Sequence, residues 1–228
     1  VFTGAGQAFW AGDDLKRYEL PDDDASMPRI FGGHHNALGT YNGLRTISQA
    51  VNVAVRNLDK LTIAAINGFA IQTGFSLALA CDFRLAARSA RMGSATLRFG
   101  LLPDEGGQWL LVQTLGVPAT MDFLMRKRIV DGDEAFELGL VHEVVDDDQL
   151  PEAALAMARE LATGPQIAMR MLKRSIYTAA ELSFGQALDE IAAKTAITDH
   201  QPDAKEGGQA FREKRAPVFN AWLDSSSS

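Results

Sequence analysis

Two stretches of this 228-residue chain carry residue types whose spacing suits chemistry. The clearer one runs from Ala65 to Asp82 (AINGFAIQTGFSLALACD), where a short apolar strand turns through glycines directly into an apolar helix. The first backbone N–H groups of a helix have no intrahelical acceptor and lie at the positive end of its dipole. Groups placed in this way stabilise a developing oxyanion. The stretch therefore predicts a site for a substrate oxygen that gains negative charge.

The other stretch is a glycine-rich turn within Gly4 to Lys16 (GAGQAFWAGDDLK), after the strand-like opening VFTG. It lacks the G-x-G-x-x-G order of a dinucleotide loop and the G-K-[ST] ending of a phosphate cradle. A Rossmann-type oxidoreductase and a Walker-type nucleotide site are therefore disfavoured. Ser76 has no Gly-x-Ser-x-Gly context, which disfavours a serine hydrolase. The pair His34 and His35 lacks a third ligand at suitable spacing, so no metal site is predicted.

The elements around these turns indicate a layered α/β fold. Apolar residues three and four apart predict an amphipathic helix over Tyr41–Leu58. Apolar runs typical of buried strands cover residues 61–65 and 82–86, and a helix opening at Gly74 lies between them. This order is a βαβ signature. A loop over residues 96–107 then leads into a helix from Gln108 to Leu115.

After Pro151 the pattern becomes almost entirely helical. The helices expected there cover residues 153–161, 165–177 and 184–195. We therefore expect a core domain over residues 1–150, a helical region over 151–224 and a disordered serine tail over 225–228. Because Val1 resembles the end of a buried strand, we also expect that strands of the sheet precede the given sequence.

Composition narrows the class of protein. With 46% hydrophobic and 22% charged residues, the chain has an ordinary globular composition, which excludes intrinsic disorder. A net charge of −7 disfavours a nucleic-acid partner. No charged-then-apolar leader opens the sequence, and the uncharged run 61–81 is interrupted by polar residues and glycines, so no membrane partner is expected. The single cysteine, Cys81, favours a reducing compartment and a cytoplasmic location.

The motifs taken together resemble the crotonase superfamily, the enoyl-CoA hydratase/isomerase family. The resemblance continues through Phe99–Trp109 (FGLLPDEGGQW), Ala135–Val141 (AFELGLV) and Glu206–Phe219 (EGGQAFREKRAPVF), so it spans nearly the whole chain in order. It implies a spiral of ββα units followed by a helical C-terminal region that forms a homotrimer or a dimer of trimers. It also implies an acyl-CoA substrate whose thioester oxygen is held by two backbone N–H groups. No cofactor is expected apart from the coenzyme A of the substrate.

Matched residue by residue, the resemblance places the first N–H donor at Asp13 and the second at Thr73. Thr73 stands where the family usually has the middle glycine of a Gly-Gly-Gly run. The two glutamates of the hydratase pattern would fall on Ser76 and Thr96, and neither is acidic here. A hydroxyl without a nearby base has a pKa far from working pH, so two-glutamate hydration is not expected.

Acidic residues follow instead as Asp104 and Glu105. The segment resembles the G-L-[VI]-P-D-x-G-G-x-W stretch of the enoyl-CoA isomerases of phenylacetate degradation, in which the aspartate moves a proton between carbons. One carboxylate suits that reaction because it can remove a proton and return it elsewhere, and burial near an acyl chain would raise its pKa. The alternatives are that Asp104 caps the helix starting at Gln108 and that Glu105 is a solvated loop acid.

The resemblance also implies the residues that contact the substrate. Trp10 would shape the acyl pocket or simply pack, and Phe211 and Lys214 would lie near the adenine, often in a neighbouring subunit. An acidic protein needs local cations to hold coenzyme A, so Lys16 is predicted to meet its phosphates, with surface solvation as the alternative. The full set predicted to bind substrate is Trp10, Ala11, Gly12, Lys16, Gly68, Gly74, Thr96, Phe211 and Lys214. With Asp104 and Glu105 as catalytic groups, we predict enoyl-CoA double-bond isomerisation. An enoyl-CoA hydratase and a non-catalytic acyl-CoA-binding subunit are the alternatives.

Overall fold

The computed structural model describes residues 1–12, 28–33 and 35–224. The described chain forms two compact units. The first comprises Val1–Leu58 and Thr62–Leu155, and the second comprises Asp59–Leu61 together with the chain from Ala156 onward. The short segment 59–61 joins the second unit because Lys173 Nζ donates to the Lys60 carbonyl at 2.9 Å and Arg174 pairs with Asp59 at 2.9 Å.

The described part of the first unit contains two four-stranded sheets. One is parallel throughout and has the order β1 (Phe2–Thr3), β3 (Ile63–Ile66), β5 (Phe83–Ala87), β8 (Glu143–Val145). The other has the order β2 (Ala8–Trp10), β4 (Phe69–Ile71), β6 (Arg91–Gly93), β7 (Ile129–Val130), and its last pair is antiparallel. Each successive pair of strands from β1 to β6 sends one strand to each sheet. This alternation is the ββα spiral that the sequence predicts.

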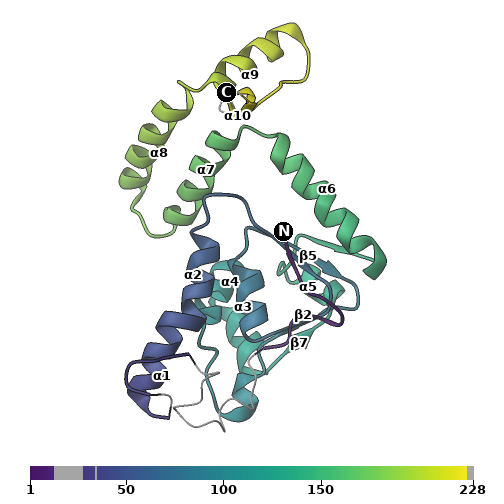
Figure 1. The fold of residues 1–228 in the computed structure, drawn as a ribbon, viewed down its shortest axis with the longest axis vertical. Helices are drawn as coiled ribbons and strands as arrows, with labels where there is room; N and C mark the ends of the chain where they lie inside the picture. Colours follow the sequence, from purple (N-terminus) through teal and green to yellow (C-terminus); the bar gives the residue numbers. More distant parts are fainter. Residues whose placement is uncertain (13–27, 34, 225–228) are drawn as a thin grey trace. The chain divides into compact units, whose positions relative to one another are not determined.

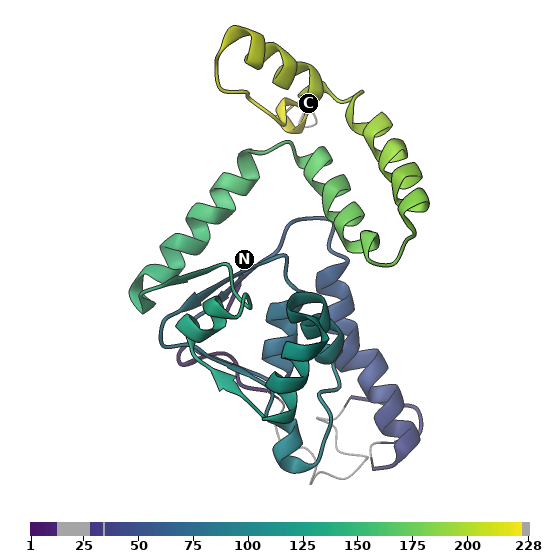
Figure 2. The same cartoon turned by 180° about the vertical axis from the view of Figure 1, so that it is seen from behind.

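Helices accompany the strands of this unit. They are α1 (Ala37–Gly43), the π-helical segment η2 (Leu44–Ser48), α2 (Gln49–Arg56), α3 (Thr73–Ala80), the 3₁₀ segment η3 (Thr96–Phe99), α4 (Gly107–Met125), α5 (Gly132–Glu137) and the 3₁₀ segment η4 (Asp147–Gln149). In Figure 1 and Figure 2, α2, α3 and α4 are neighbours. Every residue of α3 is buried, because the helix also contacts β2 and β4. A mostly apolar helix suits such a position, and Thr73 and Ser76 are the polar residues of α3.

The amphipathic helix predicted over Tyr41–Leu58 exists but differs in detail. It begins earlier, at Ala37, where the Asn36 side chain accepts the Gly39 N–H at 3.0 Å. The π-helical turn inserts an extra residue, which breaks the 3.6-residue periodicity. For that reason the predicted buried stripe is incomplete: Val55 is buried, whereas Ile47 is exposed.

The helix predicted to end at Leu115 continues to Met125 with a kink. Gly116 has a φ of +74°, a value that an L side chain rarely adopts, and Pro118 follows within the helix. The helix end that the sequence predicts at Leu115 therefore corresponds to a real kink between two helical segments. Among the described residues, no helix is both long and apolar enough to cross a bilayer.

The C-terminal helices agree with the predicted helical pattern. They are α6 (Leu150–Thr163), α7 (Gln166–Ala179), α8 (Phe184–Thr198), α9 (Pro202–Glu213) and α10 (Ala221–Asp224). A capping box at Ser183 and Gln186 opens α8. Helices α7 and α8 pack together, with Ser175 Oγ donating to Glu190 Oε2 at 2.9 Å. The last two helices are absent from the sequence prediction, which extends only to Thr195.

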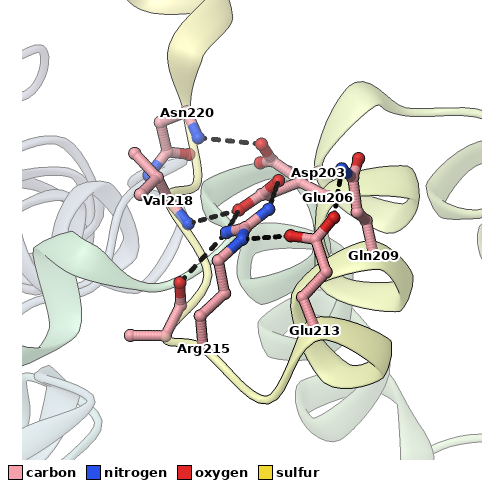
Figure 3. Close-up of polar contacts among 8 residues, drawn as sticks. Asp203, Glu206, Gln209, Glu213, Arg215, Val218 and Asn220 are labelled. Carbon is pink, nitrogen blue, oxygen red and sulfur yellow. Dashed lines mark hydrogen bonds and ion pairs between the residues drawn. The ribbon is translucent and has the colours of Figure 1, made fainter.

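An arginine-centred cluster closes the end of α9 (Figure 3). Arg215 Nη1 and Nη2 lie 2.6 and 2.9 Å from the two carboxylate oxygens of Glu206, and its Nε lies 2.6 Å from Glu213. The Val218 N–H donates to Glu206 at 2.8 Å, and the Asn220 N–H donates to Asp203 at 2.8 Å. These contacts fold the segment after α9 back onto the helix.

Candidate active site

The turn between β4 and α3 carries the predicted oxyanion donor. Thr73 is the first residue of α3 and is 3% exposed, and the Ser76 N–H donates to the Gln72 carbonyl at 2.9 Å to begin the helix. Gln72 precedes the helix without capping it, and its φ is +53°. The Thr73 amide thus lies at the positive end of the α3 dipole. This is the position that a backbone oxyanion donor requires.

Two glycines that the sequence predicts to bind substrate, Gly74 in α3 and Gly68 before β4, allow other backbone segments to approach closely. A Cβ on Gly74 would lie 2.3 Å from the Trp10 carbonyl oxygen, and a Cβ on Gly68 would lie 2.1 Å from the Gln7 carbonyl oxygen. Both positions therefore require glycine for packing, beside the substrate-binding role that the resemblance implies. Gly12, with φ +100°, would direct a Cβ toward Ile71 and Gln72 at 3.5 and 3.8 Å.

Trp10 is half-buried and Ala11 is exposed, and both directly precede Gly12 in the chain. The structure thus brings Trp10, Ala11 and Gly12 next to the β4–α3 turn. Asp13 and Lys16 lie outside the described residues.

Two consecutive carboxyl side chains face the turn from the loop before α4. Glu105 is 2% exposed, and its Oε1 accepts the Thr73 hydroxyl at 2.8 Å while its Oε2 accepts Gln72 Nε2 at 2.9 Å. Asp104 is half-buried, and its Oδ1 lies 3.5 Å from the same Gln72 Nε2. The structure therefore brings Asp104, Glu105 and Thr73 together, as the sequence predicts.

The loop backbone is held from the opposite side by α2. Gln49 Nε2 donates to the Asp104 carbonyl at 2.9 Å, and Asn52 Nδ2 donates to the Glu105 carbonyl at 2.9 Å. Asn52 is buried, and its Oδ1 has no hydrogen-bond partner among the described residues. Side-chain amides from α2 therefore fix the main chain, and groups from the turn fix the carboxyls.

Glu105 has the electrostatics of a proton-transfer group. Burial raises its pKa to about 7, and the neighbouring charge of Asp104 acts in the same direction. The hydrogen bond from Thr73 opposes this rise by favouring the ionised form. A carboxyl with a pKa near working pH can both accept and release a proton.

Two of the alternative interpretations from the sequence are wrong. Asp104 does not cap α4, because the N-cap is Gly106 with φ +92° and it makes no side-chain capping bond. Glu105 is not a solvated loop acid, since it is buried. Gly106 suits the left-handed turn that directs the preceding residue inward.

The two positions of the hydratase glutamates lie in α3 and at the start of η3. Ser76 is buried in α3, and a Cβ on Gly107 would lie 2.6 Å from its Oγ. The half-buried Thr96 exchanges a hydrogen bond with Ser94 Oγ at 2.9 Å. Hydroxyls thus stand at these two positions, and the carboxyls come from the loop before α4.

The remaining predicted residues belong to the second unit. Phe211 is 85% exposed on α9, and Lys214 ends that helix with φ +56°. Their place relative to the turn is not part of what the structure describes. Within the described chain, no group of three His, Cys, Asp or Glu side chains is arranged to hold a metal ion.

Three residues of this arrangement are missing from the sequence prediction: Gln49, Asn52 and Ser94. Gln49 and Asn52 are spaced three apart, so they share one face of a helix, and that pair of amides beside apolar residues is the signal that could have identified them. Gln72 is visible in the sequence as a departure from the glycine run, but its bonds to the carboxyls are not.

The chain is similar to known proteins over nearly its whole length. The profile of the family described as enoyl-CoA hydratase/isomerase matches residues 1–221. The chain is 33% identical over 222 residues to 1,2-epoxyphenylacetyl-CoA isomerase of Escherichia coli strain K12, covering 96% of this chain and 79% of that protein. It is 34% identical over 229 residues to carnitinyl-CoA dehydratase of Salmonella typhi, covering 96% and 80%.

Solved structures agree as well. A crystal structure of enoyl-CoA hydratase from Bacillus anthracis matches with a TM-score of 0.83 at 33% identity, covering 95% of this chain and 79% of that one. The ββα spiral, the turn before α3 and the family match over residues 1–221 lead to one assignment. The chain belongs to the enoyl-CoA hydratase/isomerase family of enzymes, which act on acyl-CoA substrates.

Proposed function

We propose that this protein is an enoyl-CoA double-bond isomerase. The observation that carries the proposal is the pair of carboxyls, Asp104 and Glu105, bonded to the residues of the β4–α3 turn. Isomerisation removes a proton from one carbon of the acyl chain and returns it to another, so it needs a carboxyl beside an oxyanion site. The similarity to an epoxyphenylacetyl-CoA isomerase agrees with this class of reaction.

In this mechanism the thioester oxygen accepts hydrogen bonds from the Thr73 N–H and, by resemblance, from the Asp13 N–H. These donors stabilise the enolate that forms when the proton leaves. Asp104 removes and returns the proton because, of the two carboxyls, it is the one that is only half-buried and so can reach a substrate. The buried Glu105 lies beside it and influences its charge.

The rest of the proposal concerns substrate and assembly. Trp10 would bound the acyl pocket, and Lys16, Phe211 and Lys214 would contact the coenzyme A end of the substrate. We propose a homotrimer or a dimer of trimers, which sedimentation or light scattering of the purified protein would test. A monomer at micromolar concentration would contradict this part.

Incubation in D2O with matched 2-enoyl- and 3-enoyl-CoA thioesters tests the reaction. Isomerisation moves the double bond without a gain of water and can introduce deuterium into the acyl chain, and mass spectrometry and NMR detect both. A product heavier by one water would identify a hydratase, the reaction that the dehydratase relatives make the main alternative. Tight thioester binding without any product would indicate the non-catalytic acyl-CoA-binding subunit and would overturn the proposal.

A further inference from the structure

Gln72 has a backbone conformation that glutamine rarely adopts. Its φ and ψ are +53° and −108°, which lie outside the small left-handed helical region open to other residues. Lys214, which also has a positive φ, has a ψ of +38° and lies inside that region. Glycine adopts the Gln72 conformation without a side-chain clash. Strain of this kind persists where the surroundings hold the residue, and it is concentrated at functional sites.

The Gln72 side chain explains what holds the residue there. It is 8% exposed, its Oε1 accepts the Ser94 hydroxyl at 2.6 Å, and its Nε2 donates to Glu105 at 2.9 Å. Its backbone N–H donates to the Gly93 carbonyl at 3.0 Å. One side chain thus connects the end of β6, the turn before α3 and the carboxyl loop. A glycine at this position could not make these contacts.

Gln72 acts on the carboxyls in a way that the other residues holding the loop cannot. Gln49 and Asn52 bind main-chain carbonyls, whose charge does not change when a carboxyl titrates. The Gln72 Nε2 can only donate, so its bond to Glu105 Oε2 favours the ionised form of that carboxyl.

We propose that Gln72 is a positioning residue of the reaction: its amide holds both carboxyls against the turn that carries the Thr73 N–H and favours the ionised form of Glu105. This inference rests on the proposed function. The groups that face Glu105 are the charged Asp104 on its own loop, the neutral Gln72 and Thr73 from the turn, and Asn52 from α2 at its carbonyl. The neutral side chain of Gln72 thus contacts the carboxyls of both Asp104 and Glu105.

Gln72→Gly tests the proposal with little danger to folding, because glycine relieves the strained φ. We expect kcat to fall about tenfold to hundredfold with KM changed less than about threefold, as for a misplaced catalytic group. We also expect the pH midpoint of kcat to rise by about half a unit or more, since ionised Glu105 loses a donated N–H.

Gln49→Ala is the matched control, because it removes an amide that holds the same loop by its backbone. It should leave the pH midpoint where it is in the wild type. A Gln72→Gly variant with wild-type kcat and midpoint, or a Gln49→Ala variant with the same midpoint shift, would overturn the proposal.

A second measurement does not depend on turnover. Thermal unfolding midpoints of Gln72→Gly, Glu105→Ala and the double variant should be non-additive, because both single changes remove one shared hydrogen bond. Additive shifts would contradict the contact on which the inference depends. If the wild type shows no isomerase activity while the shifts remain non-additive, the proposed function fails and the Gln72–Glu105 contact stands.

Discussion

Glu105 and Glu206 are held by opposite means. Glu105 is buried among the amide of Gln72, the hydroxyl of Thr73 and the negative charge of Asp104, and burial raises its pKa to about 7. Glu206 accepts two N–H groups of Arg215 and one backbone N–H, and the hydrogen bond from Arg215 lowers its pKa to about 2. Each carboxylate is thus fully bonded, but only one has a cation as its partner.

This difference distinguishes a structural carboxylate, Glu206, from one that can exchange a proton near neutral pH, Glu105. At neutral pH, Glu206 remains ionised, so it holds Arg215 and the segment after α9 at all times (Figure 3). Glu105 is poised between its two protonation states. Neutral donors and burial therefore preserve a usable proton, whereas a guanidinium partner removes it.

The largest expected effect is on turnover. Asp104→Asn keeps the size of the side chain and removes its basicity, so we expect kcat of isomerisation to fall by about 10²–10⁴. Stopped-time product analysis by chromatography measures it. Asp59→Asn, at an exposed carboxylate that pairs with Arg174, is the control and should retain wild-type kcat. An active Asp104→Asn variant would assign the proton transfer to another group.

The next effect is on stability, and its sign follows from the raised pKa of Glu105. Its folded-state pKa of about 7 lies above the ordinary 4.5, so the folded protein binds the extra proton between these values. The contribution of Glu105 to stability is complete below pH 4.5 and is lost as pH rises through about 7. We expect this loss to be about 2–3 kcal/mol.

Glu105→Gln isolates that contribution, because the isosteric amide does not titrate. Urea unfolding of both proteins from pH 4.5 to 8 should show the free energy of unfolding of the wild type decreasing relative to the variant. Parallel curves would mean that Glu105 titrates as an exposed glutamate does, and the contrast with Glu206 would disappear.

The sequence predicts the turn and the carboxyl loop because both are local. A strand, glycines and an apolar helix lie consecutively in Ala65–Asp82, and Asp104 and Glu105 are neighbours in the chain. Which of the two acids turns inward is not local information. It depends on the contact with Gln72, which lies 33 positions before Glu105 in the chain.

The supporting amides are harder to predict for the same reason. Gln49 and Asn52 reach the loop only because α2 packs beside α3 and α4, over separations of 55 and 53 residues. Helix periodicity places Gln49 and Asn52 on one face, but it does not show which segment of the chain that face contacts. The π-helical turn shifts the face further, which is why the predicted apolar stripe is incomplete.

A smaller effect is expected at the arginine-centred cluster. Glu206→Gln leaves Arg215 without its bidentate partner, so we expect faster amide hydrogen exchange at residues 216–220 and no change in peptides of the first unit. Because the pKa of Glu206 is lowered, its contribution is present above pH 4.5 and is lost as pH falls toward about 2. The variant should therefore lose less helical circular dichroism than the wild type over that range. Equal losses would show that Glu206 does not fasten this segment.

The mildest experiment asks whether burial raises the pKa of a second group, at the end of α3 far from Glu105. Cys81 follows α3 directly, is 2% exposed, and burial raises the pKa of its thiol to about 11. The thiolate is the reactive form, so labelling by a disulfide reagent at pH 8 should be at least about a hundredfold slower in the native protein than in urea. Labelling at the unfolded rate would show that water reaches the end of α3. That result would contradict the burial that raises the pKa of the Cys81 thiol.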